Sequence, residues 1–216
     1  MLIDEQTKRL IKTSGVLLLA GAIIVICTII IEKFIGWPPD GGQAERISLI
    51  IEQWAVLKWL WAGQMFACLL FLFSAILLLS TNYLEKLRPH STLLFAINSS
   101  GAVCAIIAFA LTLGSYPPAL SVSDSEPNLL NTITGGIRTT YNLGMNLMGI
   151  SYLILFLRES LNTNGIVSRI FLYAFILMTI LLFMLAYIGH LPSRTAGGVA
   201  FLIPAFLGWG FIRHVK

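Results

Sequence analysis

The hydrophobic positions of this chain fall into long segments, and the charged positions lie in the short stretches between them. Asp, Glu, Lys and Arg are absent from six windows: residues 15–31, 59–84, 91–123, 139–157, 170–191 and 195–212. A helix needs about 20 mostly apolar residues to cross a hydrocarbon core of about 30 Å. The pattern therefore predicts six membrane-spanning helices, at approximately 15–35, 59–80, 93–116, 138–157, 167–189 and 195–212.

The apolar segments favour helices over strands. Strands of a membrane barrel alternate apolar and polar residues, whereas residues 69–73 read Leu-Leu-Phe-Leu-Phe. Helices also satisfy their own backbone hydrogen bonds inside lipid. The predicted fold class is all-α, a polytopic membrane helical bundle in which residues 1–216 form a single transmembrane domain. Asp4 and Glu5 precede the first apolar run, so we expect an uncleaved first helix rather than a signal peptide.

Two segments between the spans have patterns of their own. From residue 44 to residue 61, apolar residues recur at helical spacing: Ile47, Ile50, Ile51, Trp54, Leu57 and Trp61. This spacing predicts an amphipathic helix at the outer interface before the second span, with a lid over a cavity as the alternative. Residues 115–136 are rich in Ser, Pro, Asn and Gly and are predicted to form the longest outer loop, whose role the sequence leaves open.

Composition and charge agree with a membrane protein and orient it. The chain is 57% hydrophobic and 11% charged, whereas soluble domains carry about 25% charged residues. With six spans, the basic residues on the side of the termini are Lys8, Arg9, Lys12, Lys86, Arg88, Arg158, Arg169, Arg213 and Lys216. Those on the other side are Lys33, Arg46, Lys58, Arg138 and Arg194. Basic residues in short loops collect in the cytoplasm, so we expect a multi-pass protein of the bacterial inner membrane with both termini cytoplasmic. We therefore relate the net charge of +4 to the orientation of the protein in the membrane, and we expect no nucleic-acid partner.

The sequence lacks the residues on which most intramembrane chemistry depends. Cys27, Cys68 and Cys104 sit singly in three spans, without a Cys-x-x-Cys pair or a zinc pattern. No span has a central lysine for a retinal Schiff base, and the three histidines lie in loops or at helix ends. We therefore expect no catalytic residue, no cofactor and no metal site.

Uncharged polar residues concentrate in the fourth predicted span. Arg138, Asn142 and Asn146 are four residues apart, so they share one helix face. Their helix carries Asn146 about 12 Å below Arg138. With polar residues of other helices they are predicted to line a cavity open to the outside. The candidate ligand-binding or pore-lining residues are Gln64, Arg138, Tyr141, Asn142, Asn146, Tyr152, Glu32 and His190.

Helix packing is the alternative interpretation of these polar residues. Asn and Gln commonly hydrogen-bond across contacts between membrane helices. Gly144 and Gly149 would let another backbone approach closely, and Glu32 would pair with Arg138 at the interface.

The stretch from Tyr141 to Phe183 joins a glycine-bearing span, an Asn164-Gly165 turn and a strongly apolar span. In this it resembles uncharacterised bacterial multi-span integral membrane proteins of the domain-of-unknown-function kind. The resemblance implies a membrane fold and carries over no functional residue.

Three function classes stay open. The preferred one is a non-enzymatic membrane protein that binds or assembles with a lipid, a small molecule or a protein partner, including a second copy of itself. The alternatives are a facilitator or channel for a small polar solute, and a membrane enzyme acting on a lipid-linked substrate near Arg138, Tyr141 and His190. The missing intramembrane carboxylates, lysines and histidines count against an enzyme.

Overall fold

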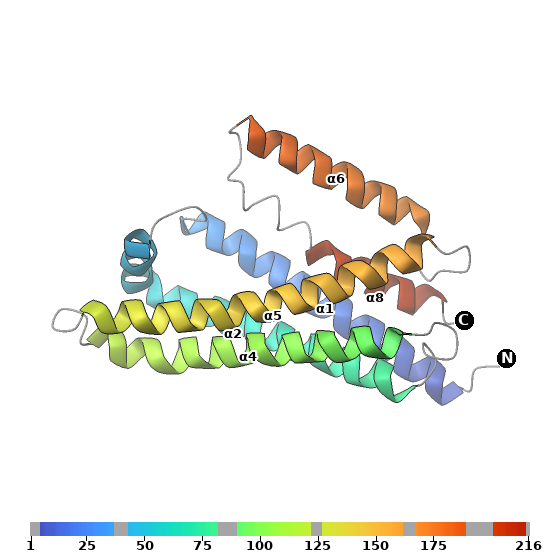
Figure 1. Cartoon of the computed structure of the whole chain (residues 1–216), viewed down its shortest axis with the longest axis horizontal. Coiled ribbons are helices and arrows are strands. Elements are labelled where there is room, and N and C mark those ends of the chain that lie inside the picture. Colours follow the sequence, from blue (N-terminus) through green and yellow to red (C-terminus); the bar gives the residue numbers. More distant parts are fainter. Residues whose placement is uncertain are drawn as a thin grey trace.

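The computed structural model describes residues 5–36, 43–81, 90–121, 127–161, 167–188 and 201–214. Within these ranges the regular elements are six helices: α1 (Glu5–Phe34), α2 (Gln43–Ser80), α4 (Ser91–Ser121), α5 (Pro127–Leu161), α6 (Arg169–Tyr187) and α8 (Leu202–His214). Figure 1 shows α1, α2, α4, α5 and α8 as one elongated bundle, with the start of α1 and the end of α8 near the same end. We call that end the terminal end and the opposite one the far end.

Four of these helices are long and apolar enough to cross a membrane: Glu5–Phe34, Glu45–Ser80, Ser91–Ser121 and Asn131–Leu161. They confirm an all-α protein with several candidate membrane spans, and they imply contact with a lipid bilayer. The two remaining helices have shorter apolar stretches, Arg169–Leu182 and Leu202–Arg213. Of the predicted sixth span at 195–212, only the part from residue 201 lies within the described residues.

The predicted loop at 115–136 is wrong over most of its length. Helix α4 continues through Pro117 and Pro118 to Ser121, and α5 already begins at Pro127. Proline's fixed φ is itself helical, and its missing N–H costs least at the first position of a helix. Ile133 and Ile137 pack against the core, so burial stabilises the first turns of α5 despite their glycines.

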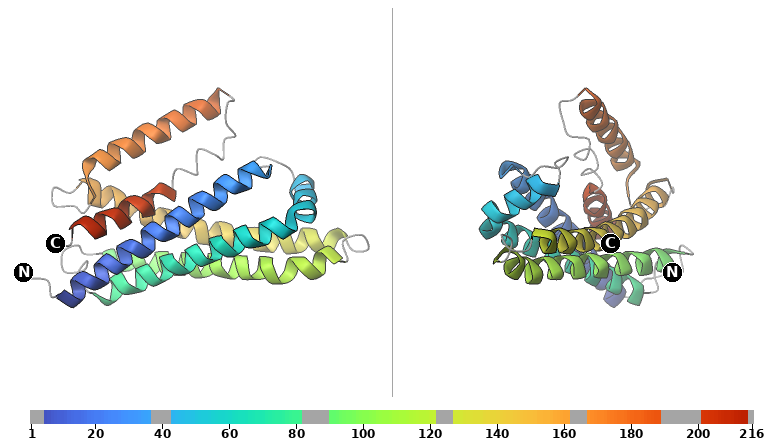
Figure 2. Two further views of the ribbon diagram at one scale, coloured as in Figure 1. Left: turned by 180° about the vertical axis from the view of Figure 1, so that it is seen from behind. Right: turned by 60° about the vertical axis from the view of Figure 1, so that its left-hand side comes forward.

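The predicted amphipathic helix at 44–61 is helical but bent. Helix α2 extends from Gln43 to Ser80 but consists of two helical parts joined by a kink at Gln53, where the backbone is not helical, with φ −111° and ψ 15°. We call residues 43–53 the α2 arm, and Figure 2 shows it turned sharply away from the rest of α2 at the far end. Ile50 of the arm is buried, whereas Ile51 is 52% exposed, because only one side of the arm faces the bundle.

Glycines bring two pairs of helices into close contact. An added Cβ on Gly101 of α4 would lie 2.8 Å from the carbonyl oxygen of Gly144 in α5, and one on Gly144 would lie 2.7 Å from the Ala105 nitrogen. Similarly, a Cβ on Gly208 of α8 would lie 2.6 Å from the Gly15 oxygen in α1. Small residues at such contacts are how membrane helices gain van der Waals packing.

Hydrogen bonds between buried side chains tie the bundle together towards the terminal end. The Ser14 and Ser74 hydroxyls lie 2.6 Å apart and join α1 to α2. The Asn98 amide nitrogen donates to Ser151 Oγ at 3.1 Å and joins α4 to α5. Such pairs give the two hydroxyls and the Asn98 amide nitrogen partners away from water, whereas Asn98 Oδ1 is buried without a partner among the described residues.

Helix α6 stands apart from the bundle in Figures 1 and 2. Its first turns make ring contacts, with Phe171 stacked 4.9 Å from Phe206 of α8 and Phe175 lying 5.4 Å from Phe156 of α5. Further along, Leu177 is 69% exposed. This apolar surface suits contact with lipid.

The α4–α5 contact yields a stability prediction. Gly101→Leu places a branched side chain where Gly144 leaves no room, so we expect a loss of about 1–3 kcal/mol and a lower melting temperature in detergent. The same change at Gly114 of α4, whose Cβ would meet no atom within 4 Å, serves as the control and should melt like the parent protein. Equal melting of both variants would contradict the close α4–α5 packing.

Candidate functional site

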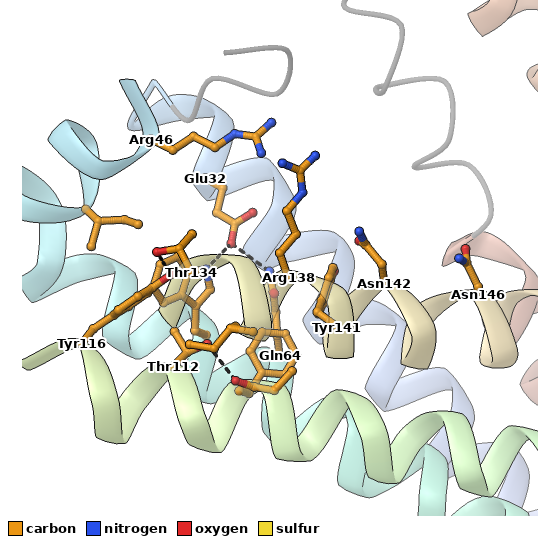
Figure 3. A pocket seen from close by; sticks show the side chains of 15 residues that line it. Glu32, Arg46, Gln64, Thr112, Tyr116, Thr134, Arg138, Tyr141, Asn142 and Asn146 are labelled. Carbon is orange, nitrogen blue, oxygen red and sulfur yellow. Dashed lines mark hydrogen bonds between the residues drawn. The ribbon is translucent and has the colours of Figure 1, made fainter. Parts of the chain in front are cut away.

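A pocket of about 710 Å³ opens at the far end of the bundle. It lies between α1 and α5, with α2 and α4 completing its walls (Figure 3). Its volume is in the range of ligand-binding pockets, about 300–1,000 Å³. The lining residues are Glu32, Arg46, Ile50, Trp61, Gln64, Ala108, Phe109, Thr112, Tyr116, Thr134, Ile137, Arg138, Tyr141, Asn142 and Asn146.

The Glu32 carboxylate is held by two donors from α2. Oε1 accepts hydrogen bonds from Gln64 Nε2 at 2.9 Å and from Trp61 Nε1 at 3.1 Å (Figure 3). The two donors are three residues apart on one helix face, and both side chains are buried. The ion pair expected between Glu32 and Arg138 is not present among the described residues, because the carboxylate turns to α2 instead.

Three aromatic rings hold the bent part of α2 against α4. The ring centroids of Trp54, Trp61 and Tyr116 lie 5.9–6.0 Å from one another, a spacing typical of attractive ring pairs. The Tyr116 hydroxyl also donates to Thr134 Oγ1 of α5 at 3.3 Å. The far-end wall of the pocket is thus tied to three helices.

The side of α5 that faces the pocket is polar and open. Arg138, Asn142 and Asn146 are all exposed in the chain as described. None of these three side chains forms a hydrogen bond or ion pair with another described residue. Tyr141, beside them, packs edge-on against Phe109 at 5.5 Å. The α5 amides therefore point into open space rather than into a helix contact (Figure 3).

Two guanidinium groups come together at the mouth of the pocket. Arg46 reaches in from the α2 arm and Arg138 from α5, and Figure 3 shows both directed towards the same region above Glu32. The pocket mouth thus holds two positive side chains and one carboxylate. Since guanidinium groups match phosphate and carboxylate oxygens bidentately, this arrangement can bind an anionic group.

A second, apolar pocket continues along α5 towards the middle of the bundle. It has a volume of about 360 Å³ and shares Asn146 with the first pocket. Its walls come from α2, α5, α6 and the start of α8. The lining residues are Phe71, Met145, Asn146, Met148, Gly149, Ile150, Tyr152, Leu153, Phe175, Phe201, Ile203 and Pro204.

The structure divides the predicted site residues into three groups. Six of them line the far-end pocket together: Glu32, Gln64, Arg138, Tyr141, Asn142 and Asn146. Tyr152 lies in the second pocket, where its ring packs 5.9 Å from that of Phe71. His190 lies outside the described residues.

Sequence reasoning missed several lining residues. Arg46 and Trp61 both belong to the amphipathic segment, and treating that segment as a lid would have pointed to them. Thr134 was assigned to a loop, and Thr112 and Tyr116 gave no signal apart from their polarity within a span.

No protein-family model matches the chain, and neither a curated protein nor a solved structure shows a match to it. The resemblance of Tyr141–Phe183 to bacterial multi-span membrane proteins therefore stays a prediction.

The Glu32 contacts predict a matched pair of stability effects. Glu32→Leu leaves the buried Trp61 and Gln64 donors without their acceptor, and we expect a loss of about 1–3 kcal/mol. Glu32→Gln keeps an oxygen at the same place and should lose much less. Thermal melting of both variants in a neutral detergent tests this; Glu32→Leu melting like Glu32→Gln would show that the two hydrogen bonds contribute nothing.

Proposed function

We propose that this protein is a non-enzymatic membrane protein whose far-end pocket binds a ligand through an anionic group. The observation that carries the proposal is the shared position of Arg46 and Arg138 at the pocket mouth, above a carboxylate already engaged by α2. An anion held between two guanidinium groups interacts favourably with both of them. Charge-assisted, bidentate hydrogen bonds to phosphate or carboxylate are among the stronger hydrogen bonds in proteins.

The shape of the polar region favours binding over permeation. The polar lining of the far-end pocket extends along α5 as far as Asn146. Beyond it the second pocket has mainly apolar walls, which include the buried side chains of Phe71, Met148 and Tyr152. A solute path through one chain needs polar groups or water along its whole length, whereas a binding pocket needs only a polar mouth and an apolar wall.

We place the protein in the bacterial inner membrane with six spans, both termini in the cytoplasm and the pocket facing outwards. The surplus of basic residues near the termini supports this orientation. The start of α1 and the end of α8 also lie at one end of the bundle, as an even number of spans requires. The charge-free stretch between Arg138 and Arg158 is about 30 Å long at 1.5 Å per residue, the thickness of the hydrocarbon core. Arg138 then lies at the outer boundary of the core.

The orientation predicts opposite labelling of two serines in one helix. Ser48 and Ser80 are exposed and lie near the two ends of α2. In a variant lacking the native cysteines, Ser48→Cys should react with a membrane-impermeant maleimide in intact cells that lack an outer membrane barrier. Ser80→Cys should react only after the inner membrane is opened. The reverse pattern would overturn the orientation.

If the pocket binds an anion, an anionic lipid should stabilise the protein, and replacing the two arginines should reduce that stabilisation. The full-length protein in a neutral detergent should melt at a higher temperature with dihexanoyl phosphatidylglycerol, and less so with the zwitterionic dihexanoyl phosphatidylcholine. Arg46→Gln and Arg138→Gln together should weaken the apparent affinity for the anionic lipid at least about tenfold, since each removes charge-assisted hydrogen bonds.

Arg9→Gln makes the same change of charge at an exposed position of the terminal end and serves as the control, which should respond like the parent. An unchanged response of the double variant would refute the proposed function.

A further inference from the structure

The two pockets follow one another along the same side of α5 and share Asn146 in their walls, so we treat them as one groove. We call this the α5 groove; it extends from Arg138 to Leu153. The second pocket continues the polar surface of the first with an apolar part, which a ligand bound at the far end can reach.

The chemistry along the α5 groove changes in a definite order. Guanidinium groups of Arg46 and Arg138 come first, then the amides of Asn142 and Asn146, and then apolar side chains around Gly149. Phospholipids present the same order from head to tail: a phosphate, ester carbonyls that accept hydrogen bonds, and an acyl chain. Amide N–H groups donate to carbonyl oxygens, so the α5 amides suit the ester region.

The length of the α5 groove also fits a lipid. From Arg138 to Leu153 the helix rises about 22 Å, at 1.5 Å per residue. Half of a hydrocarbon core of about 30 Å is about 15 Å. With Arg138 at the outer boundary of the core, the groove is therefore long enough for the whole acyl region of one leaflet, and the guanidinium groups lie at the end where the headgroup would be.

Gly149 makes room in the apolar part of the groove. A Cβ added there would meet no atom within 4 Å, in contrast to Gly144 five residues earlier, which is pressed against α4. The same pocket is also lined by Phe175 of α6, by Phe201 just before α8 and by Ile203 of α8. The space beside Gly149 is therefore bounded by apolar side chains on several sides and suits an extended hydrocarbon chain.

From these observations we infer that the α5 groove holds one anionic phospholipid of the leaflet at the far end, with its phosphate between Arg46 and Arg138 and an acyl chain beside Gly149. This inference rests on the proposed function, because it uses the same guanidinium site and names the class of ligand that fills it. The lipid lies in its ordinary orientation, with its headgroup at the membrane surface.

The inference is tested by photo-crosslinking of the full chain in phosphatidylcholine nanodiscs. The nanodiscs contain a small fraction of phosphatidylglycerol with a diazirine in the middle of one acyl chain. Crosslinked peptides identified by mass spectrometry should come from the groove, around residues 145–153 of α5 and 201–204. Phosphatidylcholine with the same diazirine should give far fewer crosslinks there.

Gly149→Phe fills the apolar part of the groove and removes a helix-weakening glycine, so the variant is expected to fold. It should lose the groove crosslinks and keep the thermal response to dihexanoyl phosphatidylglycerol, whose short chains do not reach residue 149. Gly114→Phe, on α4 and outside both pockets, should keep both. Arg46→Gln with Arg138→Gln should lose both.

The outcomes separate the two proposals. The lipid groove would be overturned if crosslinks were spread evenly over the lipid-facing helices and were unchanged by Gly149→Phe. If the thermal response to the short-chain lipid still depended on the two arginines, the anion site would stand. A thermal response to glycerol phosphate as strong as that to dihexanoyl phosphatidylglycerol would likewise overturn the lipid groove and assign the site to a free phosphate ester. If Arg46→Gln with Arg138→Gln changed neither the thermal response nor the crosslinks, both proposals would be overturned.

Discussion

The contact between Gly101 of α4 and Gly144 of α5 determines which side of α5 is open. With 3.6 residues per turn, Asn142 and Asn146 lie about 160° around the helix from Gly144. Pressing Gly144 against α4 therefore turns both amides away from that helix and towards the pocket. Arg138 lies on the same open side. A larger residue at either glycine would shift α5 and with it the whole polar face, so a backbone contact without any polar group positions the candidate site.

The polar side chains of the bundle fall into two groups. Where helices touch, several of them pair with one another, as in the pairs of Ser14 with Ser74, Asn98 with Ser151, and Gln64 with Glu32. Asn142 and Asn146 line the pocket and make no such bond with the described residues. An amide facing hydrocarbon without a partner is costly. The contrast is what a binding groove requires, because its polar groups are satisfied by the ligand or by water rather than by the fold.

Much of this could be read from the sequence, since lipid imposes a simple rule on composition. The charge-free windows located the long helices, and the spacing of Arg138, Asn142 and Asn146 placed them on one face. Helix ends and partners were harder. Gly-rich and Pro-containing residues near 127–136 were taken for a loop because local propensity does not include the burial of Ile133 and Ile137. Glu32 was expected to pair with Arg138, since opposite charge is visible in a sequence and the neutral donors Trp61 and Gln64 are not singled out.

The α2 arm explains how a groove open to lipid can still be selective. Arg46 and Ile50 reach the pocket only because the backbone bends at Gln53. Trp54, just beyond the bend, packs against Trp61 and Tyr116, and the Tyr116 hydroxyl is bonded to Thr134 of α5. The arm is therefore fixed to α2, α4 and α5 without help from a ligand. A preformed wall of this kind lowers the ordering cost of binding, so the free energy of the Arg46 and Arg138 contacts can discriminate between headgroups.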